Sequence, residues 1–400
     1  MGNVVNQRVW GADAVAGAGK KVVPVICRGR PFEMGLAQGA ALRAPVSALL
    51  NDLSDLEAFR LAKPFWAPYP LYKFYAELKA SDYLKTALLQ DAAANERMEG
   101  IAEGARIKRG SICLCNALEP FLSAFGAYIG CAHGCSAVAL RGARTLTGEP
   151  MIGRNFDYLQ MVKPCHAVRE SLPPRGLKAV EFTVAPLAGA LDGINEAGLA
   201  ISYDYAFTID QASEPAPSIS MIISAALERC RTVVEAVNYI TSRPRWGSAL
   251  LMLADESGDI ASLELSSTRS CLRRPASGEN FCFHTNRFRT TKMRDVEAPA
   301  DAVINERAPV ALRGKRLHES AERRDARLAE LLSDPAPIGV DGLSQLLADH
   351  GAEGKPSAFS PCVHSDYWNT TTSVQMFPRS RRMRISLDRP CQADYHEFAL

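Results

Sequence analysis

The chain has 400 residues, of which 47% are apolar and 22% are charged, and its formal net charge is +2. A nearly neutral chain gives no reason to expect a nucleic acid or an anionic membrane as a partner, and no run of about 18 apolar residues predicts a membrane-spanning helix. Eleven cysteines without framework spacing, behind an N-terminus without the apolar stretch of a secretory signal, favour reduced thiols and a cytoplasmic protein.

The first third of the chain has the periodicity of helices. Residues 1–20 form a leader rich in Gly, Ala and Val, and from residue 31 onward apolar side chains recur at helical spacing. Three helical segments are predicted in this part: 31–53, 81–107 and 111–129. Few segments before residue 130 have the character of a strand.

Beyond Gly134 the pattern changes to short strands in antiparallel hairpins, interrupted by helices. The predicted hairpins and strands are 136–142 with 150–158, 178–184, 190–207, 248–267, 280–286 and 370–388. The predicted helices are one long helix at 218–242 and two shorter ones at 316–332 and 341–349. Asn195, in the turn INEAG, is expected to be structural. Strands that come as hairpins indicate a layered α+β fold.

The stretch CAHGCSAV, residues 131–138, lies at the boundary between the two parts. Cys131, His133 and Cys135 are spaced like soft metal ligands, and Cys113 and Cys115 could supply a second pair. Those two, however, lie in an apolar helical stretch, where cysteine is usually a small buried side chain. A disulfide between the first and last of the three is disfavoured in a reducing compartment. We therefore expect no metal and no other cofactor.

A nucleophile is the more specific interpretation of Cys135. If the bond between Gly134 and Cys135 is cut, Cys135 carries both a thiol and a free α-amine. An α-amine has a pKa of roughly 7.7–8.0 and can act as a base near neutral pH, so one residue would supply nucleophile and base. Histidine, the usual base, is scarce at seven residues. A Cys–His dyad of the papain kind remains the weaker alternative.

The following hairpin supplies partners for this cysteine. With a turn centred on 146–148, paired positions have numbers that sum to about 294, which places Asp157 opposite position 137. Arg154 lies on the same strand. Strict alternation directs the side chains of Arg154 and Asp157 to opposite faces of the sheet.

GCS followed by GRNFDY resembles the cysteine N-terminal nucleophile hydrolases. Most similar is the branch of fungal acyl-CoA:6-aminopenicillanic acid acyltransferase and carcinine hydrolase, with bile salt hydrolases and acid-ceramidase-like amidases more distant. RPFEMGLAQGAAL, MEGIAEGARI, DGINEAGLAIS, FHTNRF and TTTSVQ resemble further segments of that branch, in the same order. The resemblance implies a four-layer αββα sandwich. It also implies a zymogen with a helical pro-segment, 1–134, that stays bound as a subunit to the catalytic chain 135–400.

The resemblance also implies roles for individual residues. Autocleavage after Gly134 exposes Cys135 as the nucleophile, and Asn286 is expected to help form the oxyanion hole. Arg154 and Asp157 match the arginine and aspartate of the family's catalytic segment, and Tyr203 and Asp204 are expected at the substrate. The family's late arginine corresponds to one of three residues: Arg323, Arg324 or Arg327.

The expected activity is hydrolysis of a C–N amide bond in a small N-acyl or peptide-like molecule through a Cys135 thioester. An N-acyltransferase that passes the acyl group to an amine is the alternative. An uncleaved binding protein is a third. Neither nucleic acid nor membrane is expected as a partner.

Overall fold

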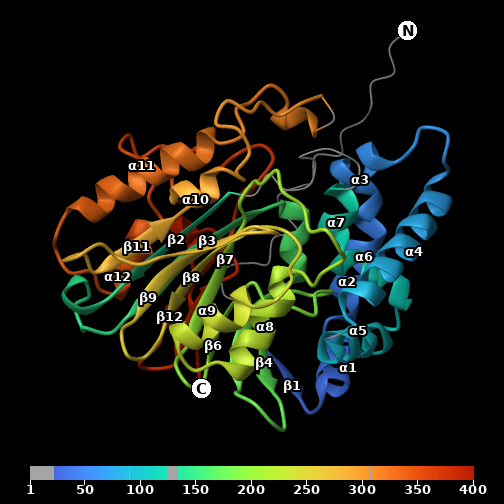
Figure 1. Ribbon diagram of the computed structural model, residues 1–400, viewed down its shortest axis with the longest axis horizontal. Helices are drawn as coiled ribbons and strands as arrows, with labels where there is room; N and C mark the ends of the chain where they lie inside the picture. Colours follow the sequence, from blue (N-terminus) through green and yellow to red (C-terminus); the bar gives the residue numbers. More distant parts are fainter. Residues whose placement is uncertain (1–21, 90, 124–133, 307) are drawn as a thin grey trace.

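The computed structural model describes residues 22–89, 91–123, 134–306 and 308–400. Two sheets stack face to face, and helices cover the outer face of each (Figure 1). This arrangement confirms the predicted α+β fold with four αββα layers. Within the described residues, no helix combines the length and apolar character needed to cross a membrane.

The larger sheet has eight strands in the order β1-β4-β5-β6-β7-β8-β9-β10. Its strands are β1 (Val25–Arg28), β4 (His166–Leu172), β5 (Ala179–Val184), β6 (Asp192–Asn195), β7 (Ala200–Asp204), β8 (Ala249–Ala254), β9 (Ile260–Leu265) and β10 (Ser270–Arg273). Neighbours are antiparallel except for β1, which runs parallel to β4. β1, β4 and β10 lie outside the strands predicted from the sequence. A charged residue such as Arg169 of β4 is expected at the surface, which obscures the pattern of a buried strand. In the structure Arg169 is buried and forms an ion pair with Glu181 of β5.

The smaller sheet has six strands in the order β11-β2-β3-β12-β13-β14. Its strands are β2 (Cys135–Leu140), β3 (Met151–Tyr158), β11 (Phe281–His284), β12 (Asn369–Phe377), β13 (Arg382–Ser386) and β14 (His396–Ala399). The inner faces of the two sheets share one apolar core, to which Ala137, Ala139, Phe182 and Met252 contribute. The predicted hairpins over 190–207, 248–267 and 370–388 are confirmed by the pairs β6–β7, β8–β9 and β12–β13.

The register predicted for the hairpin of β2 and β3 is wrong by three residues. Cys135 pairs with Phe156 and Ala137 with Arg154, so Asp157 lies beside Gly134 rather than opposite position 137. The connection between the strands is not a tight turn at 146–148. It contains a 3₁₀ turn at Gly142–Arg144 and a bridge from Thr145 to Ile338, and these move the centre of the hairpin toward β2.

Two helix pairs form the outer layers. On the larger sheet lie α8 (Ile219–Arg229) and α9 (Val233–Thr241), and on the smaller sheet lie α11 (Glu319–Ser333) and α12 (Val340–Leu347). A short helix, α10 (Thr291–Arg294), follows β11. The single helix predicted over 218–242 is wrong. Cys230 leaves the helical conformation, and Thr232 begins α9 by accepting a hydrogen bond from the Glu235 N–H at 3.2 Å.

The N-terminal helices pack at one end of the sandwich, coloured from blue to teal in Figure 1. They are α1 (Pro31–Ala41), α2 (Arg43–Asp52), α3 (Glu57–Ala62), α4 (Tyr69–Ala87), α5 (Ala92–Ala105), α6 (Arg109–Asn116) and α7 (Leu118–Ser123), with a 3₁₀ turn at Leu53–Asp55. α1 and α5 approach so closely that a Cβ on Gly100 would lie 2.0 Å from the Phe32 carbonyl oxygen. Gln38 of α1 donates to the carbonyls of Ala185 and Leu187, both at 2.9 Å. The described residues of 22–123 therefore share a core with the two sheets.

Candidate active site

Cys135 is the first residue of β2, and its side chain is buried between the two sheets. Burial raises the pKa of its thiol above the ordinary value. Its backbone N–H donates to Asn286 Oδ1 at 2.9 Å. Cys131 and His133 lie outside the described residues. Among the residues that are described, Cys113, Cys115 and Cys135 belong to no converging group of metal-ligand side chains.

Gly134 fits its position because it has no side chain. Its carbonyl oxygen accepts a hydrogen bond from the Asp157 N–H at 2.9 Å. A Cβ at Gly134 would lie 2.8 Å from Asp157 Oδ2 and 3.5 Å from an Arg324 nitrogen. The peptide bond before Cys135 is thus held between a backbone donor, a carboxylate and a guanidinium group.

Arg154 bridges the two sheets directly behind the thiol. Its side chain is 1% exposed. It donates to Asp192 Oδ2 at 2.7 Å and to Asp204 Oδ1 at 3.0 Å, and one nitrogen lies 3.3 Å from Cys135 Sγ. Burial alone would lower the pKa of Arg154, but the two aspartates and the thiol raise it above the ordinary value, so the group stays charged. A fixed cation at this distance favours the thiolate form of cysteine.

Asp204, which the sequence analysis expected at the substrate, lies behind Arg154 instead. It is fully buried, and burial raises its pKa to about 7. Its neighbour Asp192 is also fully buried, with a pKa raised by burial to about 6. The two aspartates hold the arginine rather than line a cavity.

Asp157 faces away from the thiol, as strand alternation predicts. It lies on the outer face of the smaller sheet, where its Oδ1 accepts from Thr370 Oγ1 at 2.5 Å. Burial raises the pKa of Asp157 to about 7, against the opposing effect of Arg324. Asp157 is thus placed beside Gly134, whereas Arg154 is placed beside the sulfur of Cys135.

Asn286 follows β11 and is oriented by its hydrogen bonds. Its Oδ1 accepts from the Cys135 N–H at 2.9 Å and from Arg324 at 2.6 Å. Its Nδ2 donates to the Tyr205 carbonyl at 2.8 Å. Two donors at one end and an acceptor at the other fix which end is oxygen. The amide nitrogen carries a second N–H, beyond the one directed at Tyr205.

Arg324 is the late arginine that contacts the site, and the sequence did not separate it from its neighbours. It is buried in α11 and donates to the Cys135 carbonyl and, at 3.0 Å, to Ser136 Oγ. Arg323 pairs with Glu319 on the same helix, and Arg327 pairs with Asp349. The helical periodicity of α11 could have singled out Arg324. It lies on the buried face of the helix with Ala321, Leu328 and Leu332.

The charges of the site do not balance. Two arginines, Arg154 and Arg324, face three aspartates, Asp157, Asp192 and Asp204, all of them buried. When all five are ionised, one negative charge is in excess. His284, whose Nε2 lies 3.6 Å from Asp204, does not compensate for it, because burial lowers its pKa well below the ordinary value. Near pH 7 a proton on one of the aspartates removes this excess, and at higher pH a further positive charge would be stabilised here.

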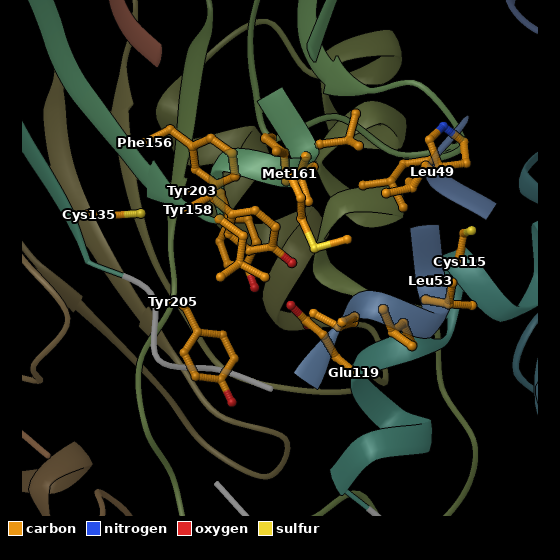
Figure 2. Close-up of a pocket in the computed structure, with 18 of the residues that line it drawn as sticks. Leu49, Leu53, Cys115, Glu119, Cys135, Phe156, Tyr158, Met161, Tyr203 and Tyr205 are labelled. Atoms are coloured by element: carbon orange, nitrogen blue, oxygen red, sulfur yellow. The ribbon is translucent and has the colours of Figure 1, made fainter. Parts of the chain in front are cut away.

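An apolar cavity of ≈ 130 Å³ opens in front of the thiol. Figure 2 shows the Cys135 sulfur directed toward Phe156, Tyr158 and Tyr203, with Leu49 and Leu53 of the N-terminal part across the cavity. Tyr203 was expected at the substrate, and its side chain lines this space. Except for Glu119 and Arg154, the lining carries no charged side chain.

A second cavity, of ≈ 180 Å³, lies on the other side of the same peptide bond. Gly134, Asn286 and Arg324 line it, as do the charged residues Lys315, Arg316 and Glu319. Cys135 lines only the first cavity, and Asn286 lines only the second. The Gly134–Cys135 bond therefore lies between two cavities, of which the second carries more charged side chains in a lining that is otherwise largely apolar.

A family model described as acyl-coenzyme A:6-aminopenicillanic acid acyl-transferase matches residues 145–392, more than half of the chain. The match includes Arg154, Asp157, Asn286 and Arg324 and begins beyond Cys135.

Solved structures give weaker likenesses. A Caenorhabditis elegans ortholog of N-acylethanolamine-hydrolyzing acid amidase is 15% identical with a TM-score of 0.41, over 66% of this chain and all of its own. A mutant of conjugated bile acid hydrolase from Clostridium perfringens is 13% identical with a TM-score of 0.43, over 66% and 97%. Penicillin V acylase from Agrobacterium tumefaciens is 12% identical with a TM-score of 0.36, over 66% and 86%.

The Arg154→Met substitution should destabilise the fold by about 3–5 kcal/mol at pH 8, because it leaves two buried carboxylates without their cation. The folded-state pKa values of Asp192 and Asp204, about 6 and 7, lie above their ordinary value of 3.8. Arg154 opposes the effect of burial on both groups, so its removal raises their pKa values further. At pH 5 both carboxyl groups are largely protonated in the folded protein with or without the cation, and the additional cost of losing it appears as the pH rises through 6 and 7. Denaturant unfolding at pH 5 and pH 8 should give the larger loss at pH 8.

Arg245→Met is the matched control for this experiment. Arg245 is also buried, but its guanidinium donates to the backbone carbonyls of Arg243, Ser266 and Arg269. Its removal should destabilise the protein to a similar degree at both pH values. An equal pH response in both variants would contradict the pairing of Arg154 with ionised aspartates.

Proposed function

The chain belongs to the acyl-coenzyme A:6-aminopenicillanic acid acyl-transferase family, and from this premise we propose that it is a self-processing amidohydrolase with Cys135 as its N-terminal nucleophile. The single observation that carries the proposal is the environment of Cys135. Its backbone nitrogen is held by Asn286, and its sulfur lies between Arg154 and an apolar cavity. One residue thus presents both a prospective base and a nucleophile to a space suited to an acyl group.

Processing would begin with attack of Cys135 Sγ on the Gly134 carbonyl carbon. The C–N bond breaks as the thiol proton passes to the Cys135 nitrogen, and a thioester forms. Water then hydrolyses this thioester, leaving a carboxylate on Gly134 and a free thiol and amine on Cys135. The hydrogen bond from the Asp157 N–H to the Gly134 oxygen supports this step, because a donor there stabilises the developing oxyanion.

Charge supports processing as well. The new α-amine adds a group that is cationic when protonated, in a site where the carboxylates exceed the arginines by one. Above pH 7, where the three aspartates are ionised, an α-ammonium group would balance that charge. The neighbouring Asn286 oxygen can accept a hydrogen bond from the amine and direct its lone pair toward the thiol.

In the catalytic cycle the α-amine takes the thiol proton as Cys135 Sγ attacks the substrate amide. The oxyanion is stabilised by the second N–H of Asn286, and the proton then passes to the departing amine. The acyl thioester remains on Cys135. A water molecule, deprotonated by the α-amine, attacks this thioester, which releases the acid and restores the thiol.

The two cavities suggest which part of the substrate binds where. An apolar acyl group fits the cavity at Cys135, and the amine part fits the cavity at Asn286, whose lining includes Lys315, Arg316 and Glu319. Leu49 and Leu53 line the acyl cavity, so the chain 1–134 would have to stay bound after cleavage. An amine that enters the second cavity in place of water would make the protein an N-acyltransferase, which is the alternative function. A binding protein that is never cleaved is less favoured.

Mass spectrometry of the purified protein should find two chains, 1–134 and 135–400, the larger beginning Cys-Ser-Ala-Val. Cys135→Ala should abolish cleavage and activity, because both need the thiol. Gly134→Ala should slow cleavage, because the added Cβ meets Asp157 at 2.8 Å. Cys131→Ala is the control and should be processed normally. An intact chain with full amidase activity would contradict the mechanism.

Straight-chain N-acyl amides should be hydrolysed with a kcat/KM that rises about three- to fourfold for each added methylene until the cavity is full. Met161→Trp, which narrows the cavity, should reduce the rate for long chains and spare short ones. Product analysis with an added amine separates the two functions. Free acid as the main product supports a hydrolase, whereas preferential formation of the new amide would identify an acyltransferase.

Asn286→Ala should slow acyl transfer by about 10²–10³-fold in the processed protein, because one oxyanion donor is lost. Asn286→Asp distinguishes the two roles of this side chain, since it keeps an oxygen near the α-amine but has no N–H. Equal loss in both variants supports the oxyanion role. If Asn286→Asp retains near-normal kcat, the residue instead positions the α-amine.

A further inference from the structure

A second group of reactive side chains lies outside the active site, in the segment around β12. It is formed by two histidines and two cysteines, here called the His/Cys cluster: His350, Cys362, His364 and Cys391. One ligand atom from each of the four lies within 4.8 Å of all the others. Within the described part of the chain, no other set of His, Cys, Asp or Glu side chains converges in this way. We propose that the His/Cys cluster binds a zinc ion.

The distances match a tetrahedral zinc site. With Zn–S near 2.3 Å and Zn–N near 2.0–2.1 Å, the edges of the tetrahedron are about 3.3 Å for N···N and about 3.5 Å for S···N. His350 Nε2 lies 3.2 Å from His364 Nε2. The sulfurs of Cys362 and Cys391 lie 3.4 Å and 3.6 Å from the same His364 nitrogen. Three edges of the tetrahedron thus have the lengths expected for zinc, and the other three are no longer than 4.8 Å.

The ligand types in the His/Cys cluster favour zinc. Two thiolates cancel the charge of a divalent ion, and two neutral imidazoles complete four-coordination, as in structural zinc sites. A disulfide between Cys362 and Cys391 is the competing arrangement for the two sulfurs. It would leave unexplained why two histidines direct their Nε2 atoms at the same point.

The proposed ion would be structural rather than catalytic, because four protein ligands leave no open position. It would join the loop after α12 to the 3₁₀ turn Pro390–Gln392, which carries Cys391. Between two of the ligands, Val363 exchanges hydrogen bonds with Thr370 at 2.8 and 3.0 Å. Thr370 in turn donates to Asp157 beside Gly134. The metal would therefore hold in place the loop that supports Asp157.

Metal content tests this proposal. Protein purified under reducing conditions without chelator should contain about one zinc per chain by inductively coupled plasma mass spectrometry. Cys391→Ser should lower zinc content by about tenfold or more after dialysis. Cys271→Ser, at a partly exposed thiol of β10 outside the cluster, should retain the ion. Cys391→His should also retain it, because a histidine can replace the lost ligand at this exposed position.

Cobalt gives a second readout that does not depend on activity. Co²⁺ bound to the reduced protein should show the strong visible bands of tetrahedral coordination and a thiolate charge-transfer band, and Cys362→Ser should lose the latter in part. Cys135→Ala should bind zinc normally, which separates this proposal from the proposed function. Reduced, folded protein that takes up neither ion would overturn the proposal. So would a Cys362–Cys391 disulfide in protein purified without reductant but with zinc present.

Discussion

The buried guanidinium group of Arg154 is the interaction on which the site depends. It lies on β3 of the smaller sheet and pairs with Asp192 and Asp204 of the larger one, so it crosses the interface where the two sheets stack. Burying a charge without partners costs several kcal/mol, so the cation requires both aspartates to be in place. Because Cys135 lies 3.3 Å from the same group, the stacking of the sheets and the environment of the thiol are set together.

The two faces of the smaller sheet carry different groups of the site. Cys135 and Arg154 face the interior between the sheets, where the apolar cavity lies. Asp157, Ser136 and Arg324 lie on the outer face and surround the peptide bond of Gly134 from the other side. Strand alternation directs Arg154 to the thiol on one face of the sheet and Asp157 to the Gly134 peptide group on the other. The bond between Gly134 and Cys135 lies where both sets of groups can reach it.

The N-terminal helices are part of the same unit. Gly35 and Gly39 of α1 meet Gly100 and Gly104 of α5 at a distance that excludes any side chain. This close packing fixes α1, whose Gln38 binds the backbone of the segment that includes Pro186 and Leu187 on the cavity wall. Side chains from both sides of the proposed cleavage point thus form one cavity, which is why a separated small chain would have to remain attached.

The sequence by itself determined the features that depend on residues close together along the chain. Alternation and turn residues identified the hairpins at 190–207, 248–267 and 370–388, and helical periodicity identified α11 and α12. The change of pattern at Gly134 and the family resemblance indicated Cys135, Arg154, Asp157 and Asn286. All four lie near the Gly134–Cys135 bond.

Tertiary structure alone decided the rest, because the deciding contacts join residues far apart in the chain. The connection between β2 and β3 pairs through Thr145 with Ile338, which is far away in the sequence, and no local pattern records this contact. Asp204 binds Arg154 rather than substrate because the two sheets stack there, and Arg324 is selected over its neighbours because one face of α11 is buried. The His/Cys cluster joins His350 to Cys391 across a strand hairpin. Only packing, which brings distant polar groups together and removes them from water, could place these residues.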